Sequence, residues 1–216
     1  MPPRALEPAG VALVDKPAGP SSFAIVAQIR RVTGAKTGHA GTLDPFATGL
    51  LLILSGRSTK LAPTLVGLDK RYLTEIDLSA TTTTGDPEGE IVEQHAVPDD
   101  LDLDSLRGEI ELPVPAASAV KIDGERAYKL HRRGVAVEMP MRRSLVHALD
   151  VVDRRGECVT LDMRVSSGTY VRSIAQALGG HCRTLRRLEV GPFSVDEASA
   201  PDDFTLLSEA EALARL

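Results

Sequence analysis

The chain has 216 residues, of which 43% are hydrophobic and 25% charged, and its formal net charge at pH 7 is −5. This length and composition match an ordinary globular protein with a buried core, and they exclude disordered, collagen-like and disulfide-scaffold proteins. The net charge alone gives no reason to expect a nucleic-acid partner.

Two further features concern where the protein works. The longest aliphatic run, residues 50–54, is far shorter than the roughly 20 residues that span a bilayer, and the Pro-rich N-terminus has no apolar signal core. Cys158 and Cys182 lack CxxC spacing and are expected to be reduced thiols. We therefore expect a cytoplasmic protein that contacts no membrane.

The first predicted elements are a strand at residues 11–14 and an amphipathic helix after it. Ser21 or Ser22 caps this helix, and Gly34 ends it. Three apolar residues recur at helical spacing on its inner face: Ile25, Ile29 and Val32. Residues 49–54 then predict a fully buried strand.

The middle of the chain predicts short helices, a strand and a turn. A helix capped by Ser58 precedes a half-exposed strand at residues 72–78. A turn at residues 85–89 leads into the returning arm of a hairpin. Residues 99–106 predict a capped acidic helix.

The second half of the chain predicts more strands than helices. A basic helix at residues 125–133 precedes three strands, and two helices follow them. These strands lie at 135–139, 144–153 and 157–165, and the helices at 168–178 and 206–216. Because no regular βαβ alternation occurs, the elements predict an α+β fold with a mixed, largely antiparallel sheet flanked by helices.

Charge is distributed unevenly along the chain. Residues 1–72 carry a net charge of +5, whereas residues 73–119 carry −11 and residues 196–216 carry −5. Residues 120–143 and 144–195 add +4 and +2. All three tyrosines lie within two residues of a Lys or Arg, which suits phosphate contact combined with base stacking. A basic cleft for RNA and ordinary surface variation are both consistent with this pattern.

One segment surrounds a single carboxylate with small residues. Residues 38–49 read GHAGTLDPFATG and run into the most apolar predicted strand. Pro45 disfavours a helical backbone at Asp44, and the glycines permit tight turns and close approach of a ligand. By these residues alone, Asp44 is either a turn residue or a catalytic acid.

This segment resembles the signature of the TruB family of pseudouridine synthases, and the resemblance extends over residues 10–195. Further blocks are similar to that family in the same order: Lys16-Pro17 with 19–22, Lys70-Arg71-Tyr72, 85–89, 115–121, 127–134 and 168–172. The resemblance implies a pseudouridine-synthase-like fold, no metal and no other cofactor. It also implies that uridine at position 55, in the TΨC loop of tRNA, is converted to pseudouridine.

The resemblance implies roles for individual residues as well. Asp44 is the ionised catalytic carboxylate, either as a nucleophile or as a base toward the ribose, and Arg172 pairs with it. Tyr72 stacks on the flipped uracil, and Tyr170 lines the pocket beside it. The alternative for each tyrosine is a structural residue at the edge of a sheet. The alternative for Arg172 is an arginine on a helix surface that faces solvent.

Three more residues are expected to bind RNA. His39 contacts the RNA when the target base leaves its stack, and no Cys, Asp or second His stands near it at metal-ligand spacing. Leu188 forms an apolar wall under the uracil. Lys16 is a candidate phosphate contact, as are Lys60, Lys121, Arg132, Arg186 and Arg187. The alternative for His39 is a hydrogen-bonded structural histidine, and the alternative for Leu188 is an ordinary core leucine.

We expect residues 1–216 to form a single catalytic domain without the C-terminal PUA-type RNA-binding domain of typical bacterial relatives. The expected partner is the T-arm stem-loop of tRNA, bound by a monomer that needs no guide RNA. One alternative is a relative of the guide-RNA-dependent synthases of archaea and eukaryotes. The other is an RNA chaperone or binding module, against which the presence of Asp44, Tyr72 and Arg172 together argues.

Overall fold

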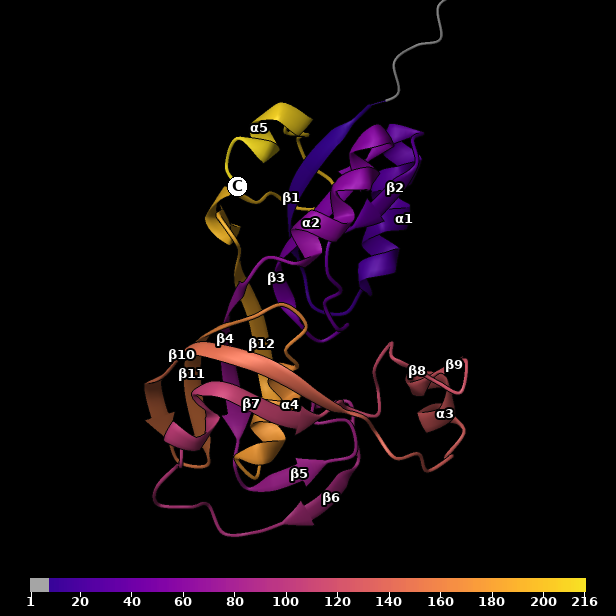
Figure 1. Cartoon of the computed structure of the whole chain (residues 1–216). Coiled ribbons are helices and arrows are strands. Elements are labelled where there is room, and N and C mark those ends of the chain that lie inside the picture. Colours follow the sequence, from indigo (N-terminus) through magenta and orange to yellow (C-terminus); the bar gives the residue numbers. More distant parts are fainter. Residues whose placement is uncertain (1–7) are drawn as a thin grey trace, which may run out of the picture. The chain divides into compact units, whose positions relative to one another are not determined.

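The computed structural model describes residues 8–216, which fold as two compact units (Figure 1). The first unit contains the described residues up to Tyr72 together with residues 186–216, and the second contains residues 73–185. Strands β4 (Lys70–Asp77) and β12 (His181–Val190) each have residues in both units. Among the described residues no helix is both long and apolar enough to cross a membrane.

The first unit is built on a mixed sheet in the order β1-β3-β12. Strand β1 (Gly10–Lys16) pairs antiparallel with β3 (Thr48–Ser55), and β12 pairs parallel with β3. Two short strands extend this sheet: β2 (Thr37–His39) on β3 and β13 (Phe193–Ser194) on β12. The predicted buried strand is confirmed, because every residue of β3 after Thr48 is buried.

The core of this unit consists mainly of aliphatic side chains from β1 and β3, joined by residues of α2 and β13. It includes Val11, Leu13, Leu50, Leu52, Leu54, Leu65 and Phe193. Removing such side chains from water supplies most of the stability of a sheet of this kind. The aliphatic run is therefore a core strand, and it carries the segment around Asp44 at its N-terminal end.

Helix α1 (Ser22–Thr33) begins and ends as predicted. The Ser21 side chain accepts a hydrogen bond from the Ala24 backbone N at 3.2 Å, and Gly34 ends the helix with a φ of 65°. Its buried face contains Ile25 and Ile29. The prediction for Val32 is wrong: this side chain is 72% exposed, because the last turn of α1 extends beyond the core.

The other helices of the first unit are short. They are η1 (Gly56–Leu61), α2 (Ala62–Val66), η3 (Val195–Glu197) and α5 (Glu209–Leu213). Ser58 lies inside η1 and does not cap it, which corrects the prediction. Ser208 caps α5 through a capping box with Glu211, so the predicted terminal helix exists but is shorter.

The second unit contains strands in the order β12-β4-β11-β10-β7. Residues of β4 alternate between buried and half-buried, as predicted for residues 72–78. Strands β10 (Met141–Arg155) and β11 (Cys158–Val165) form an antiparallel hairpin, and β7 (Gly108–Pro113) pairs with β10. Helix α4 (Val171–Ala177) confirms most of the helix predicted after Gly168.

Two further predictions concern the second unit, and one of them differs from the structure. The hairpin around residues 85–89 is confirmed by β5 (Ala80–Thr82) paired with β6 (Ile91–Gln94). The acidic helix at residues 99–106 is wrong, because only the 3-10 turn η2 (Asp104–Leu106) forms. This segment buries a single leucine, Leu106, and an amphipathic helix needs a longer apolar face to be stable.

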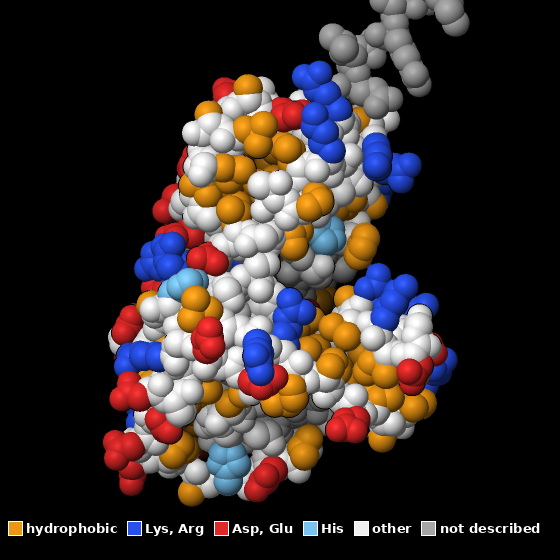
Figure 2. Space-filling model, viewed as in Figure 1, with side chains coloured by type: hydrophobic (Ala, Val, Ile, Leu, Met, Phe, Trp, Pro, Cys, Tyr) orange, Lys and Arg blue, Asp and Glu red, His pale blue; other side chains and the backbone are white. Residues whose placement is uncertain are grey.

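Residues 114–140 form a small lobe of the second unit. It contains the hairpin β8 (Lys121–Ile122) and β9 (Glu125–Arg126), followed by α3 (Ala127–Arg132). The predicted basic helix therefore starts two residues later, and the strand predicted at residues 135–139 does not form. Lys and Arg side chains gather on this lobe (Figure 2).

Candidate active site

Asp44 lies half-buried in the loop of residues 40–47, between β2 and β3 in the first unit. The loop closes on itself, because the backbone N of Ala47 donates to the carbonyl oxygen of Asp44 at 3.1 Å. Gly49 follows with a φ of 97°, and a Cβ there would lie 2.2 Å from the Arg187 carbonyl oxygen. Only glycine therefore allows β12 to approach β3 just after this loop.

Lys16, at the end of β1, is fully buried and binds the backbone of the Asp44 loop. Its Nζ donates to the carbonyl oxygens of Pro17 at 2.9 Å, Pro45 at 3.1 Å and Ala47 at 2.7 Å. A side chain with no exposed surface cannot reach an RNA phosphate in this structure. The predicted phosphate contact is corrected accordingly: Lys16 supports the Asp44 loop.

Arg187 holds the same loop from β12 and is 1% exposed. Its Nε donates to the Leu50 carbonyl at 2.7 Å, and its two Nη atoms donate to Thr42 at 3.4 Å and to Gly41 at 3.1 Å. The candidate phosphate contact at Arg187 is also wrong for this reason. Two buried cations thus bind backbone carbonyls on both sides of Asp44 and help to satisfy the hydrogen-bonding groups of this segment.

We expect Lys16→Met to lower the free energy of unfolding by about 2 kcal/mol, since it removes a buried donor from carbonyl groups that stay buried. Urea unfolding measures this change. Lys60→Met is the matched control, because Lys60 has a 64% exposed side chain paired with Glu209 at 2.9 Å. Its loss should cost less than about 1 kcal/mol. Equal effects of the two substitutions would contradict the structural role of Lys16.

His39 ends β2 and is half-buried. Its ring meets the Phe23 ring edge to face, with centroids 5.3 Å apart and an interplanar angle of 83°. Burial, and then the positive charge of Arg187, lower the pKa of His39 below 6.5, so the imidazole is uncharged at neutral pH. Within the described part of the chain, its Nδ1 is buried without a hydrogen-bond partner. The RNA-contacting role of His39 stays a prediction.

Tyr72 and Leu188 belong to the same unit as Asp44. Tyr72 is 8% exposed on β4, where the alternation places it on the buried face with Lys70. Leu188 lies on β12 and packs partly buried against the core of the first unit. Both are apolar surfaces of the unit that carries Asp44, and their stacking and wall roles toward uracil stay predictions.

Lys70 is a buried lysine on the same face of β4 as Tyr72. Its Nζ donates to the carbonyls of Val66 and Leu68. Burial, reinforced by the charge of Arg187 and opposed by Asp69, lowers the pKa of Lys70 from 10.5 to about 8.

Between about pH 8 and pH 10.5 the Lys70 side chain is protonated in the unfolded chain but deprotonated in the folded chain, so the free energy of unfolding should rise with pH. Urea unfolding at about pH 7.5 and about pH 9.5 should show this rise in the wild type and a smaller one in Lys70→Met. An equal rise in the free energy of unfolding for the wild type and Lys70→Met would contradict the lowered pKa of Lys70.

Arg172 is 3% exposed on α4 in the second unit and is tied to the turn after β5. Its Nη1 donates to the Thr84 carbonyl at 2.7 Å and pairs with Asp86 Oδ2 at 3.1 Å, and its Nη2 donates to the Ala117 carbonyl at 3.0 Å. The alternative of a solvent-facing arginine is therefore wrong. The pairing of Arg172 with Asp44, a residue of the other unit, stays a prediction.

Asp86 is a residue whose role the sequence reasoning missed. Its Oδ1 accepts hydrogen bonds from Thr84 Oγ1 at 2.6 Å and from the Glu88 backbone N at 3.1 Å, while its Oδ2 faces Arg172. The signal is present in the Gly85-Asp86-x-x-Gly89 block, which the sequence identifies as a turn and as a block similar to the TruB family, with no role for Asp86 itself. The block also supplies a buried carboxylate for the guanidinium of Arg172.

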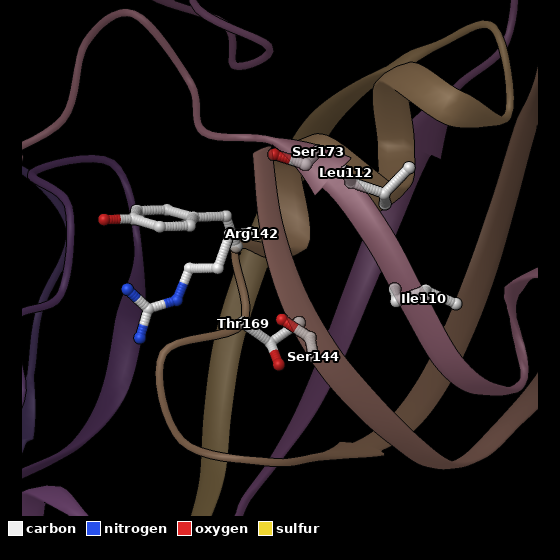
Figure 3. A pocket seen from close by; sticks show the side chains of 7 residues that line it. Ile110, Leu112, Arg142, Ser144, Thr169 and Ser173 are labelled. Carbon is white, nitrogen blue, oxygen red and sulfur yellow. The ribbon is translucent and has the colours of Figure 1, made fainter. Parts of the chain in front are cut away.

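Tyr170 lines a small pocket in the second unit (Figure 3). The other lining residues are Ile110, Leu112, Arg142, Ser144, Thr169 and Ser173. Figure 3 shows the Arg142 guanidinium and the hydroxyl groups of Ser144 and Thr169 around this hollow. The pocket therefore combines one cation, several hydroxyls and an aromatic ring, while the role of Tyr170 toward uracil stays a prediction.

No group of three or more His, Cys, Asp or Glu side chains within residues 8–216 could hold a metal ion. Neither Cys158 nor Cys182 forms a disulfide within residues 8–216. The Asp44 loop brings a half-buried carboxyl group together with the buried cations of Lys16 and Arg187.

A family model described as TruB family pseudouridylate synthase (N terminal domain) matches residues 29–171. The chain belongs to the TruB family. The tRNA pseudouridine synthase B of Thermobifida fusca (strain YX) is 42% identical over 95% of this chain and 78% of that protein. The protein of that name from Mycobacterium sp. (strain KMS) is 44% identical over 88% of this chain and 69% of its own length.

Solved structures confirm the predicted pseudouridine-synthase-like α+β fold of this TruB family chain. A chain in the crystal structure of a Cbf5-Nop10-Gar1 complex is similar with a TM-score of 0.66 and 29% identity. That likeness covers 87% of this chain and 50% of the other, so the chain spans half the length of that relative. A structure described as pseudouridylate synthase shares the fold with a TM-score of 0.56 and 18% identity over 98% of this chain and 76% of the other.

Proposed function

We propose that the protein isomerises uridine to pseudouridine in tRNA, at position 55 of the TΨC loop. The relatives that carry the name tRNA pseudouridine synthase B, at 42% and 44% identity, support the reaction and the substrate class. The observation in this chain that carries the proposal is the Asp44 loop, whose backbone is bound by the buried cations of Lys16 and Arg187.

The reaction is balanced without a co-reactant. The bond between ribose C1′ and uracil N1 breaks, the uracil turns, and C1′ bonds to C5 of the same base. The C5 proton leaves and N1 gains a proton, so no atom or electron is lost. An ionised carboxylate at C1′ or at the ribose suffices as nucleophile or base, and we assign that role to Asp44.

The proposal extends to the surroundings of Asp44. Tyr72 stacks on the flipped uracil, Leu188 lies under it, and His39 contacts the RNA that the uridine has left. Arg172, on α4, is proposed to pair with Asp44. Tyr170, directly before α4, is proposed to line the pocket for the uracil. Among the cations, exposed groups of the lobe at residues 114–140 suit phosphate contact better than Lys16 or Arg187.

We further propose that the protein acts in the cytoplasm as a monomeric single catalytic domain, on the T-arm and without guide RNA. A guide-RNA-dependent activity is the second candidate, favoured by the likeness to the Cbf5-Nop10-Gar1 complex. The relatives named for tRNA share more of their sequence with this chain, 42–44% against 29%. This difference favours tRNA recognition by the protein alone.

The test incubates purified protein with an unmodified tRNA transcript and no other macromolecule, then maps pseudouridine by carbodiimide modification and primer extension. The expected result is one modified position, uridine 55 of the T loop. Modification that requires an added guide RNA would support the second candidate. Absence of pseudouridine under both conditions would contradict the enzymatic proposal.

A further inference from the structure

Phe23 is a large exposed aromatic side chain beside the Asp44 loop. It is 71% exposed in the first turn of α1. Its neighbour Ser22 is buried, and the Ser22 hydroxyl hydrogen-bonds both the backbone N and the carbonyl oxygen of Leu43 at 2.8 Å. Gly19 N also donates to the Pro45 carbonyl at 2.8 Å. The start of α1 is thus fixed to the residues on both sides of Asp44.

The Phe23 ring is held in place by His39. The edge-to-face contact at 5.3 Å is a favoured geometry for two aromatic rings and restricts the rotation of an otherwise exposed side chain. The imidazole is uncharged because burial lowers its pKa, and its Nδ1 has no partner among the described groups. The two residues, here called the Phe23–His39 ring pair, therefore present an uncharged aromatic surface, most of it from the exposed Phe23 ring.

The surrounding chain is cationic. Residues 16–43 contain no Asp or Glu, and Arg30, Arg31 and Lys36 within them are exposed. Phe23 and Arg30 are seven residues apart and so share one face of α1, separated by roughly 10 Å along its axis. An aromatic ring and a guanidinium on one helix face combine the two kinds of group that contact bases and phosphates of a single strand.

We propose that the Phe23–His39 ring pair stacks against a base that flanks the target uridine, with Arg30 on a neighbouring phosphate. This inference rests on the proposed function and names a contact for the RNA of that reaction. When the target uridine leaves its stack, the neighbouring bases lose a stacking partner, and an aromatic side chain can replace it. A single exposed apolar residue such as Val32 has no comparable ring contact and serves as the reference.

The experiment measures RNA affinity in the Asp44→Asn background, so that no turnover disturbs the equilibrium. A fluorescein-labelled T-arm stem-loop is titrated and followed by fluorescence anisotropy. Phe23→Ala should raise the dissociation constant about tenfold, in the range measured when a base-stacking ring is truncated. Phe23→Leu should weaken binding similarly, because it keeps apolar volume without a ring, whereas Phe23→Trp should bind at least as tightly as the parent.

Val32→Ala is the matched control, since Val32 lies on the same helix with the same exposure, 72% against 71%. It should leave affinity unchanged, and unfolding midpoints should stay equal in all variants. An affinity of Phe23→Ala within twofold of the parent, or full affinity of Phe23→Leu, overturns the inference. Pseudouridine formation by the wild type is assayed separately: its absence with a Phe23 effect intact refutes the proposed function and leaves the ring pair as an RNA contact.

Discussion

Asp44→Asn should lower the rate of pseudouridine formation at least about a thousandfold while changing RNA affinity less than about threefold. Asparagine preserves the shape of the side chain but cannot ionise, so it is neither a nucleophile nor a base of useful strength. The loop itself should persist, because Lys16 and Arg187 donate to its backbone carbonyls, which the substitution leaves in place.

Nucleoside analysis of T-arm RNA after single-turnover incubation measures the rate, and anisotropy measures the affinity. Asp203→Asn is the control in the same unit, since Asp203 is an exposed carboxylate and should be dispensable. Retention of more than about a tenth of the wild-type rate by Asp44→Asn would be too high for loss of the reacting carboxylate and would remove Asp44 from its assigned role.

Asp86→Ala should cost about 3–5 kcal/mol in the free energy of unfolding, because it removes one partner of a buried ion pair with the guanidinium of Arg172. Arg172 and Asp86 are only 3% and 4% exposed. The carboxylate also accepts from Thr84 and Glu88, so its removal leaves these donors unpaired in the turn as well. The expected loss is therefore large for a single substitution.

Asp153→Ala is the matched control for an ion pair in the same unit. Asp153 pairs with Arg155 at 2.7 Å, but these side chains are 43% and 85% exposed. Its loss should cost less than about 1 kcal/mol. Urea unfolding of both variants compares them directly. A cost below about 1 kcal/mol for Asp86→Ala would show that the turn reorganises and leaves Arg172 solvated.

The sequence predicted the features that depend on near neighbours. Strict alternation over residues 72–78 identified β4, the uninterrupted aliphatic run identified β3, and Ser21 with Gly34 delimited α1. The segment GHAGTLDPFATG was singled out because small residues around one carboxylate, followed by a buried strand, are poorly suited to a solvated loop. The family resemblance then supplied what these patterns leave open, namely the reaction.

Long-range contacts explain the errors. Lys16 bonds carbonyls 29 and 31 residues away, and Arg187 bonds carbonyls 137 to 146 residues away, so nothing near either residue indicates that its charge is buried. Charge in the local sequence predicts exposure by default, which is why both were assigned to RNA phosphates. The helix predicted at residues 99–106 is wrong for a local reason. Acidic residues and a cap indicated a helix, but the segment has too little apolar surface to bury.

Release of tritium from a T-arm stem-loop labelled at C5 of its target uridine tests the central claim most directly. C5 loses its hydrogen only when it bonds to C1′, so each product molecule releases one label to water. Wild-type protein alone should release the label completely, and Asp44→Asn should release none above background. No release by the wild type, or equal release by the two proteins, would contradict the assignment of this chain as an Asp44-dependent tRNA pseudouridine synthase.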